Sequence, residues 1–267
     1  MGDFTHLILT RFNVRVAASW SDKALDPTWL AHRFELFETY CVPPMRHQTV
    51  RDFRWLIFFD AQTPREWIDR IEAYRDSANI ETEFLEAFDE QLWRAAIARH
   101  VDHARPGLLT TRLDNDDALS IDSVDRIQRA GAQHGHGFLV FSAGYTIHNG
   151  RAYLVHDDSN AFASLYEPAP AQRTVWCEQH QRIRDHSDVA QVPDVPSWAQ
   201  IIHGRNVSNR VRGRLLPADG IAERFAWEPT LLRAPGPAAL AIDRLVRCPL
   251  RSTREWLIGK ARAVRGA

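Results

Sequence analysis

The stretch Thr110-Thr-Arg-Leu-Asp-Asn-Asp-Asp117 begins with the character of a buried strand and ends in three carboxylates within four residues. Carboxylates this close repel one another, so they need a cation beside them. Mg²⁺ and Mn²⁺ suit such an oxygen-rich cluster, because these ions take one or two carboxylates and let substrate phosphates complete an octahedron. The stretch therefore predicts a divalent metal held at a strand end beside a diphosphate.

Two other interpretations of the acidic run are weaker. A loop that caps a following helix needs one Asp or Ser, whereas this run has three acids after an arginine. An EF-hand loop starting at Asp114 would need Gly at its sixth position, where Leu119 stands, and a Glu at its twelfth. If the strand continues to its end, Asp114 and Asp116 lie on one side and Asp117 on the other.

Short apolar runs alternate with longer amphipathic ones on the N-terminal side of this stretch. We predict strands over residues 6–10, 53–60, 80–85 and 108–113, and helices over residues 28–40, 64–76 and 90–103. This order is typical of an α/β fold with a parallel sheet covered by helices. Ligands bind at the carboxyl ends of such strands, which makes Asp60 a candidate, although an Asp there can also simply start a loop.

The pattern changes after Asp117. A helix is predicted over residues 121–129, followed by antiparallel strands over residues 138–142, 145–148 and 151–155. Asn149-Gly150 between the last two strands predicts a type I′ hairpin turn. The sequence therefore indicates a twisted mixed sheet rather than a purely parallel one.

Composition limits the classes of partner. The chain has 267 residues, 33 Lys and Arg against 34 Asp and Glu, and a net charge of -1, which disfavours nucleic acid as the main partner. The three cysteines are far apart and form no C-x-x-C pair, so neither a disulfide framework nor a zinc knuckle is indicated. Without a run long enough for a signal peptide or spanning helix, we expect a cytoplasmic protein.

The C-terminal part differs in character from the rest. We place a domain boundary between residues 1–209 and 210–267, because Pro, Gly, Arg and Ala dominate the second range. Residues 233–267 carry eight bases and only two acids, with Leu, Ile and Trp among them. This tail predicts either a basic amphipathic helix on an anionic membrane, at the inner face, or a terminal helix with a solvated basic face.

Several motifs occur in a fixed order along residues 4–209. They are Thr10-Arg-Phe-Asn13, Leu36-Phe-Glu-x-Tyr-Cys-x-Pro43, Trp55-Leu-Ile-Phe-Phe-Asp60, the acidic run, Asn160-x-Phe-x-Ser-Leu-x-Glu167 and His203-Gly-x-Asn206. The strand ending in D-x-D resembles the nucleotide-sugar half of a GT-A glycosyltransferase. The whole ordered set resembles the bacterial rhamnosyltransferase family.

The resemblance implies a GT-A-like domain with a C-terminal helical extension, and it implies roles for matching residues. In such enzymes the ends of the first two strands hold the nucleotide. The resemblance also implies phosphate contacts later in the chain, after His203. The implied nucleotide-sugar contacts are Thr10, Arg11, Asp60, Arg112, Asp114, Arg205 and Asn206. Arg112 could instead pair with Asp114, which is a structural role.

The same resemblance implies a Mn²⁺ or Mg²⁺ cofactor. Its D-x-D aspartates correspond to Asp114 and Asp116, with Asp117 adjacent. Some relatives supply a late histidine as a further metal or phosphate ligand, and His203 matches by position. A histidine after an apolar run is otherwise an ordinary hydrogen-bonded edge residue.

The implied reaction is the metal-dependent transfer of a sugar, with rhamnose as the family default, from a UDP- or dTDP-linked donor to a hydroxyl acceptor. Inverting transfer needs a base that removes the acceptor proton. We expect Glu167, before Pro168, or Glu178 in that role, and Asp157 and Asp158 are further candidates. No spacing rule separates these acids.

Two other function classes stay open. A nucleotidyltransferase would also hold Mg²⁺ on strand-end aspartates, but the segment Thr10-Arg-Phe-Asn-Val14 is not the Gly-rich phosphate loop expected there. A non-catalytic carbohydrate-binding or nucleotide-sugar-binding protein could keep the fold without turnover. Metal-dependent binding of a nucleoside diphosphate without sugar release would indicate that class.

Overall fold

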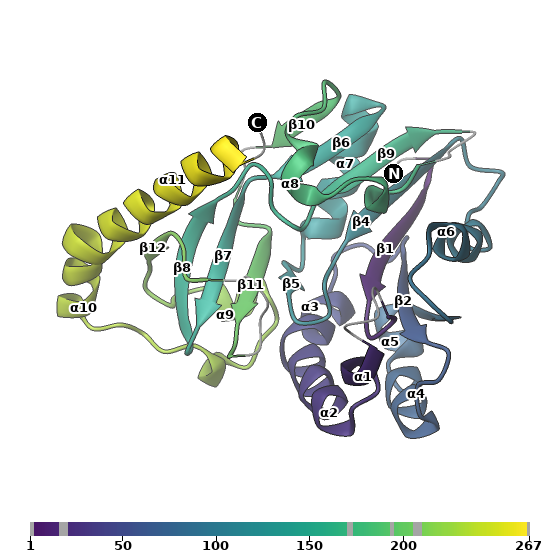
Figure 1. The fold of residues 1–267 in the computed structure, drawn as a ribbon, viewed down its shortest axis with the longest axis horizontal. Coiled ribbons are helices and arrows are strands. Elements are labelled where there is room, and N and C mark those ends of the chain that lie inside the picture. Colours follow the sequence, from purple (N-terminus) through teal and green to yellow (C-terminus); the bar gives the residue numbers. More distant parts are fainter. Residues whose placement is uncertain (1–2, 16–20, 170–172, 193–194, 205–209, 266–267) are drawn as a thin grey trace.

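A seven-stranded mixed sheet forms the centre of the structure, a computed structural model that describes residues 3–15, 21–169, 173–192, 195–204 and 210–265 (Figure 1). In spatial order the strands are β10 (Val189–Val192), β6 (Gly137–Phe141), β9 (Ser164–Pro168), β4 (Gly107–Arg112), β1 (Thr5–Arg11), β2 (Arg54–Asp60) and β3 (Ile80–Leu85). The strands β4, β1, β2 and β3 are parallel, and β9 is antiparallel to both of its neighbours. The α/β class and the four predicted parallel strands are confirmed.

A second sheet lies beside the first (Figure 1). Its strands, in spatial order, are β12 (Arg214–Leu215), β8 (Arg151–His156), β7 (Ala143–His148), β11 (Trp198–Ile202) and β5 (Ala118–Leu119). The strand β11 runs parallel to β7 and antiparallel to β5. Because β5 directly follows the acidic run, the second sheet begins where that run ends.

The helical segments are distributed along the whole chain. They are α1 (Ser21–Ala24), α2 (Pro27–Leu36), η2 (Phe37–Cys41), α3 (Val42–Arg46), α4 (Arg65–Glu72), α5 (Arg75–Ala78), α6 (Glu90–Ala98), α7 (Ser123–His134), η3 (Val175–Cys177), α8 (His180–Ile183), α9 (Ile221–Arg224), η4 (Pro229–Leu231), α10 (Pro237–Ile242), η5 (Asp243–Arg247) and α11 (Cys248–Arg265). The predicted helix at 121–129 extends to His134, where Gly135 caps it with a left-handed φ of 74°.

Helices cover both faces of the first sheet, as the sequence predicted. Successive residues of β1 point to opposite faces, so Ile8 packs in one cluster and Leu7 and Leu9 pack in another. The first cluster contains Leu30 and Phe34 of α2, and the second contains Trp93 and Ile97 of α6. This two-sided cover leaves the strand ends as the open part of the sheet.

The hairpin between β7 and β8 has the predicted turn. Asn149 has φ 49° and Gly150 has φ 72°, which are the two positive values that a type I′ turn requires. The strand β6 was wrongly grouped with this antiparallel set, because it lies in the first sheet between β10 and β9. Its five residues are all buried, as expected for a strand covered on both faces, and only Ser142 separates it from β7.

Part of the predicted C-terminal extension belongs to the packed body. The strand β12 pairs with β8, and Phe225 and Trp227 pack in one cluster with Tyr145 and Ile147 of the second sheet. Figure 1 shows α11 running along the outside of the molecule beside the second sheet. The chain is therefore packed into the core well past residue 209, and only the last helices form an appendage.

Replacing Gly144 with alanine should destabilise the junction of β7 and β11. A Cβ atom at Gly144 would lie 2.1–2.4 Å from atoms of the buried indole of Trp198. We expect a loss of about 1–3 kcal/mol in the free energy of unfolding, measured by urea denaturation. Gly236→Ala is the control, because nothing lies within 4 Å of its added Cβ. Equal stability of the two variants would contradict this packing.

The buried histidine of β1 should make the fold sensitive to acid. His6 bonds Thr111 Oγ1 at 2.9 Å, and burial, partly offset by Asp52, lowers its pKa to about 3. As the pH falls, His6 is protonated in the unfolded chain before it is protonated in the folded protein. The stability present above pH 6.5 is therefore lost as the pH falls toward 3.

Between pH 7 and pH 5 the wild type should lose about 2 kcal/mol more than His6→Gln, by urea denaturation at both pH values. Identical losses in the two proteins would show that the histidine is not buried in its neutral form.

Candidate active site

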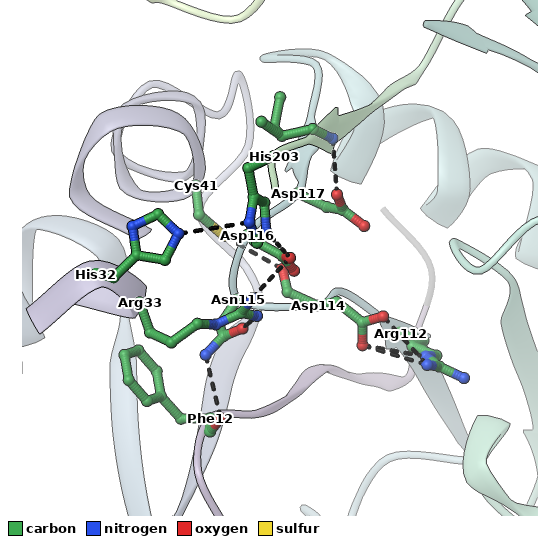
Figure 2. Close-up of polar contacts among 11 residues, drawn as sticks. Phe12, His32, Arg33, Cys41, Arg112, Asp114, Asn115, Asp116, Asp117 and His203 are labelled. Atoms are coloured by element: carbon green, nitrogen blue, oxygen red, sulfur yellow. Dashed lines mark hydrogen bonds and ion pairs between the residues drawn. The ribbon is translucent and has the colours of Figure 1, made fainter. Parts of the chain in front are cut away.

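The acidic loop after β4 is attached to the end of β1. Backbone pairing continues past the strands, with Leu113 N donating to Leu9 O at 3.1 Å. Asn115, between the D-x-D aspartates, donates from Nδ2 to Phe12 O at 3.1 Å (Figure 2). These bonds hold the loop at the carboxyl ends of the parallel strands, where the sequence predicted a site.

Asp116 lies between a guanidinium and an imidazole. Its Oδ2 accepts from Arg33 Nη1 at 2.8 Å and lies 3.0 Å from His203 Nε2 (Figure 2). Burial alone would raise the pKa of Asp116, but Arg33 and His203 outweigh burial and hold it below its usual value. The structure therefore brings together two of the four predicted metal ligands, with Asp116 ionised at neutral pH.

Arg33 and His32 come from α2, and sequence analysis missed both. Arg33 also bonds the side-chain oxygen of Asn115 and lies 5.6 Å from the ring of Trp29. His32 Nε2 is 3.4 Å from His203 Nδ1. Neither residue has a motif of its own, since a long-range contact from the middle of a helix leaves no spacing signal.

Asp114 faces away from Asp116. Its carboxylate contacts the guanidinium of Arg112, with Oδ2 3.1 Å from Nη2, and this contact raises the pKa of Arg112. Arg11 is the next cation, lying over the ring of Phe88 at 5.0 Å. Burial lowers the pKa of Arg11, and Asp114 partly reverses this effect. The side of the loop with Asp114 is therefore rich in arginine.

Asp117 points to the second sheet. Its Oδ1 accepts from Ile201 N of β11 at 3.0 Å (Figure 2). Burial raises the pKa of Asp117 well above its usual value, and Asp116 and Asp114 add to this effect. The raised pKa favours the neutral form of this carboxyl group, and the bond to Ile201 fastens the loop to β11.

Only part of the predicted ligand set suits a metal ion. Within the described ranges, no three His, Cys, Asp or Glu side chains form a metal-binding group. Asp116 Oδ2 and His203 Nε2 are 3.0 Å apart and are hydrogen-bonded to each other, so His203 could share an ion with Asp116 only after Nε2 gives up its proton. Of the two groups, the carboxylate is the ligand type that Mg²⁺ and Mn²⁺ prefer, and these ions complete their shell with water and phosphate oxygens.

Two predicted nucleotide contacts have their polar groups directed into the protein. The Thr10 hydroxyl donates to Leu113 O at 2.6 Å and accepts from Trp55 Nε1 at 2.8 Å. The Asp60 carboxylate accepts from Arg15 Nε at 2.6 Å and from Gln62 N at 2.9 Å. Both side chains are fully buried, so they shape the strand ends from within.

A polar cleft lies beside β11 and the segment that joins β8 to β9, next to Arg112. Its lining includes Asp157, Ser159, Asn160, Phe162, His180, Gln181, Trp198, Gln200, Arg210 and Arg212. Arg112 Nη1 is 3.5 Å from His180 Nδ1, which connects the cleft with the arginine-rich side of the acidic loop. Burial, followed by Arg112, lowers the pKa of His180 to about 4, so its ring is neutral at pH 7.

Asp157 is the carboxylate of this cleft. Its Oδ2 accepts from Arg212 Nη1 at 2.6 Å, and Oδ1 accepts from Ser159 N at 3.0 Å. Burial would raise its pKa, but Arg212 and Ser159 outweigh burial and lower it. The cleft therefore contains an ionised carboxylate that the sequence identified only as one of several acids.

The other predicted acids lie elsewhere. Glu167 is paired with Leu108 in the sheet, four residues or about 13 Å along β4 from Arg112, and its carboxylate binds Arg173. Glu178 accepts from Gln179 N at 2.8 Å and is 3.2 Å from His186 Nε2. Arg205 and Asn206 lie outside the described residues.

Solved structures with similar chain traces include TarS from S. aureus. The TarS 1-349 structure in complex with UDP-GlcNAc has 11% identity and a TM-score of 0.49, with 79% of this chain and 62% of that chain covered. Another TarS structure has 11% identity and a TM-score of 0.46, with 76% and 37% covered. The chain thus spans about a third to two thirds of these TarS chains.

No curated protein matches the sequence at a significant level. A family model does match, over residues 5–215, and its description is "Putative rhamnosyl transferase". The matched region contains every strand of both sheets, the acidic loop and the polar cleft. The chain therefore belongs to this rhamnosyl transferase family.

Proposed function

We propose that the protein is a metal-dependent, inverting glycosyltransferase that uses a nucleoside diphosphate sugar and a hydroxyl acceptor. Rhamnose is the first sugar to test, because the family description names it. The observation that carries the proposal is the Asp116–His203 pair, which lies beside an arginine-rich strand end. A metal with few protein ligands and a set of guanidinium groups together suit a diphosphate.

Asp116 and His203 would hold Mn²⁺ or Mg²⁺, which supplies neutralisation of the negative charge on the departing diphosphate. Arg33 fixes the Asp116 carboxylate by a direct bond, and its second bond to Asn115 fixes the loop backbone. Arg33 and His203 both contact Oδ2 of Asp116. Metal binding at this oxygen therefore requires that Arg33 share or release it. We assign Arg33 a positioning role.

Arg112 and Arg11 would bind the diphosphate oxygens. A guanidinium donates in a planar fork that matches phosphate as well as carboxylate. In the structure Asp114 occupies the fork of Arg112, so it takes the place that a phosphate group would use. Exchange of Asp114 for phosphate would free that carboxylate to accept from the ribose hydroxyls.

Asp157 is the best-placed group to activate the acceptor. It is ionised, lies in the cleft that adjoins Arg112, and is oriented by Arg212. In the proposed step the acceptor oxygen attacks the sugar C1 while its proton passes to Asp157. The bond from C1 to the diphosphate breaks, and the diphosphate leaves with the electron pair. One base and one displacement produce inversion at C1.

Asp116→Asn should reduce transfer by at least about a hundredfold, because it removes a charged metal ligand worth several kcal/mol of transition-state stabilisation. The assay is release of nucleoside diphosphate from a panel of UDP- and dTDP-sugars with Mn²⁺, repeated in excess EDTA. Asp219→Asn makes the same change at an exposed aspartate and should keep full activity. Undiminished turnover in EDTA would refute the metal mechanism.

Asp157→Asn should lower kcat by about a hundredfold or more while leaving nucleotide affinity unchanged, as expected for loss of a general base. Glu167→Gln is the comparison, because it neutralises an acid in β9 that is bound to Arg173. If Glu167→Gln were the damaging change and Asp157→Asn were not, the base would be the one first expected from sequence.

A further inference from the structure

The C-terminal helices form an appendage whose polar side chains face the protein and whose apolar side chains face outward. The segments α10, η5 and α11 follow one another without a break from residue 237 to residue 265. Figure 1 shows them along the outer edge of the second sheet. In the described part of the chain, none of the helices has the length and apolar character that crossing a bilayer demands.

This appendage contacts the protein through charged side chains. Asp243 is buried, accepts from Leu215 N at 2.9 Å, and is bonded by Arg251 Nη2 at 2.8 Å. Arg251 also donates to Gly213 O at 2.8 Å. Further along, Glu255 is bonded twice by Arg210, at 2.5 and 2.7 Å. Its polar side is therefore the one that packs on the body.

The apolar side of the same helices points outward. Six large apolar side chains are about half exposed or more: Ile242 (48%), Leu245 (75%), Val246 (51%), Leu250 (65%), Trp256 (57%) and Leu257 (55%). Five of the six lie three, four or seven residues from another member, and Trp256 adjoins Leu257, so the set occupies one broad side of the helices. An amphipathic helix of a globular protein normally turns this face to the core, so an exposed one marks a contact surface.

The same helices also carry exposed basic residues. Arg244, Arg247 and Arg254 are exposed, whereas the two acids of residues 233–267, Asp243 and Glu255, are bonded to arginines on the inward side. A second copy of this surface would bring arginines against arginines. A bilayer with anionic lipids offers both negative charge for the arginines and an apolar layer for Leu and Trp.

We propose that the face formed by Ile242, Leu245, Val246, Leu250, Trp256 and Leu257 binds the surface of an anionic lipid bilayer. The helix lies in the plane of the interface, with the apolar side chains among the acyl chains and the arginines at the headgroups. Its inward ion pairs fasten the protein to the membrane-bound helix. This inference does not depend on the proposed transfer reaction.

The test is cosedimentation of the purified protein with vesicles of phosphatidylcholine alone or with a quarter phosphatidylglycerol, at low and high salt. The wild type should bind the anionic vesicles and lose affinity at high salt. Leu245→Glu/Leu250→Glu should weaken binding by at least about tenfold, since two leucines lose their place in the apolar layer and two negative charges are added. Leu92→Glu, at another exposed helical leucine, should bind as the wild type does.

Circular dichroism of the variants checks that the helix is retained, and analytical ultracentrifugation reports self-association. Failure of the wild type to bind anionic vesicles would overturn the proposal, and so would unchanged binding of the double variant. A dimer that the double variant dissociates, with no vesicle binding by the wild type, would assign this face to a second copy of the chain instead.

Discussion

Three carboxylates within four residues can share one buried loop only if each has a different means of compensation. Asp114 has the guanidinium of Arg112, Asp116 has Arg33 and His203, and Asp117 has a raised pKa and a backbone amide of β11. An unpaired buried carboxylate would cost several kcal/mol. The conformation of the loop after β4, and with it the whole candidate site, depends on this division of partners.

The contacts of this loop also connect different parts of the molecule. Arg33 brings α2 to the loop, Asn115 ties it to the end of β1, and Asp117 ties it to β11 of the second sheet. The polar cleft lies beside β11 and next to Arg112. The proposed donor side and the proposed acceptor side therefore adjoin each other where the acidic loop meets the second sheet.

Sequence periodicity was sufficient for the parallel strands and for the hairpin, because both depend on local patterns of burial and turn residues. The acidic run and His203 were recognised as parts of one site, and the structure places Asp116 and His203 in contact. Burial was harder to predict. Thr10 and Asp60 have residue types suited to a ligand, yet their polar atoms bond inside the core. Arg33 carried no signal, since its partner is 83 residues away. Whether a polar side chain reaches a ligand depends on the direction in which it points. A position at the end of a strand does not reveal that direction.

The most direct test of the central claim is a crystal structure with bound UDP or dTDP and Mn²⁺, with the metal located by its anomalous scattering. We expect one manganese ion about 2.1 Å from both Asp116 Oδ2 and His203 Nε2, with diphosphate oxygens completing its shell. A manganese ion bound elsewhere, with Asp116 still held by Arg33 and His203, would contradict it.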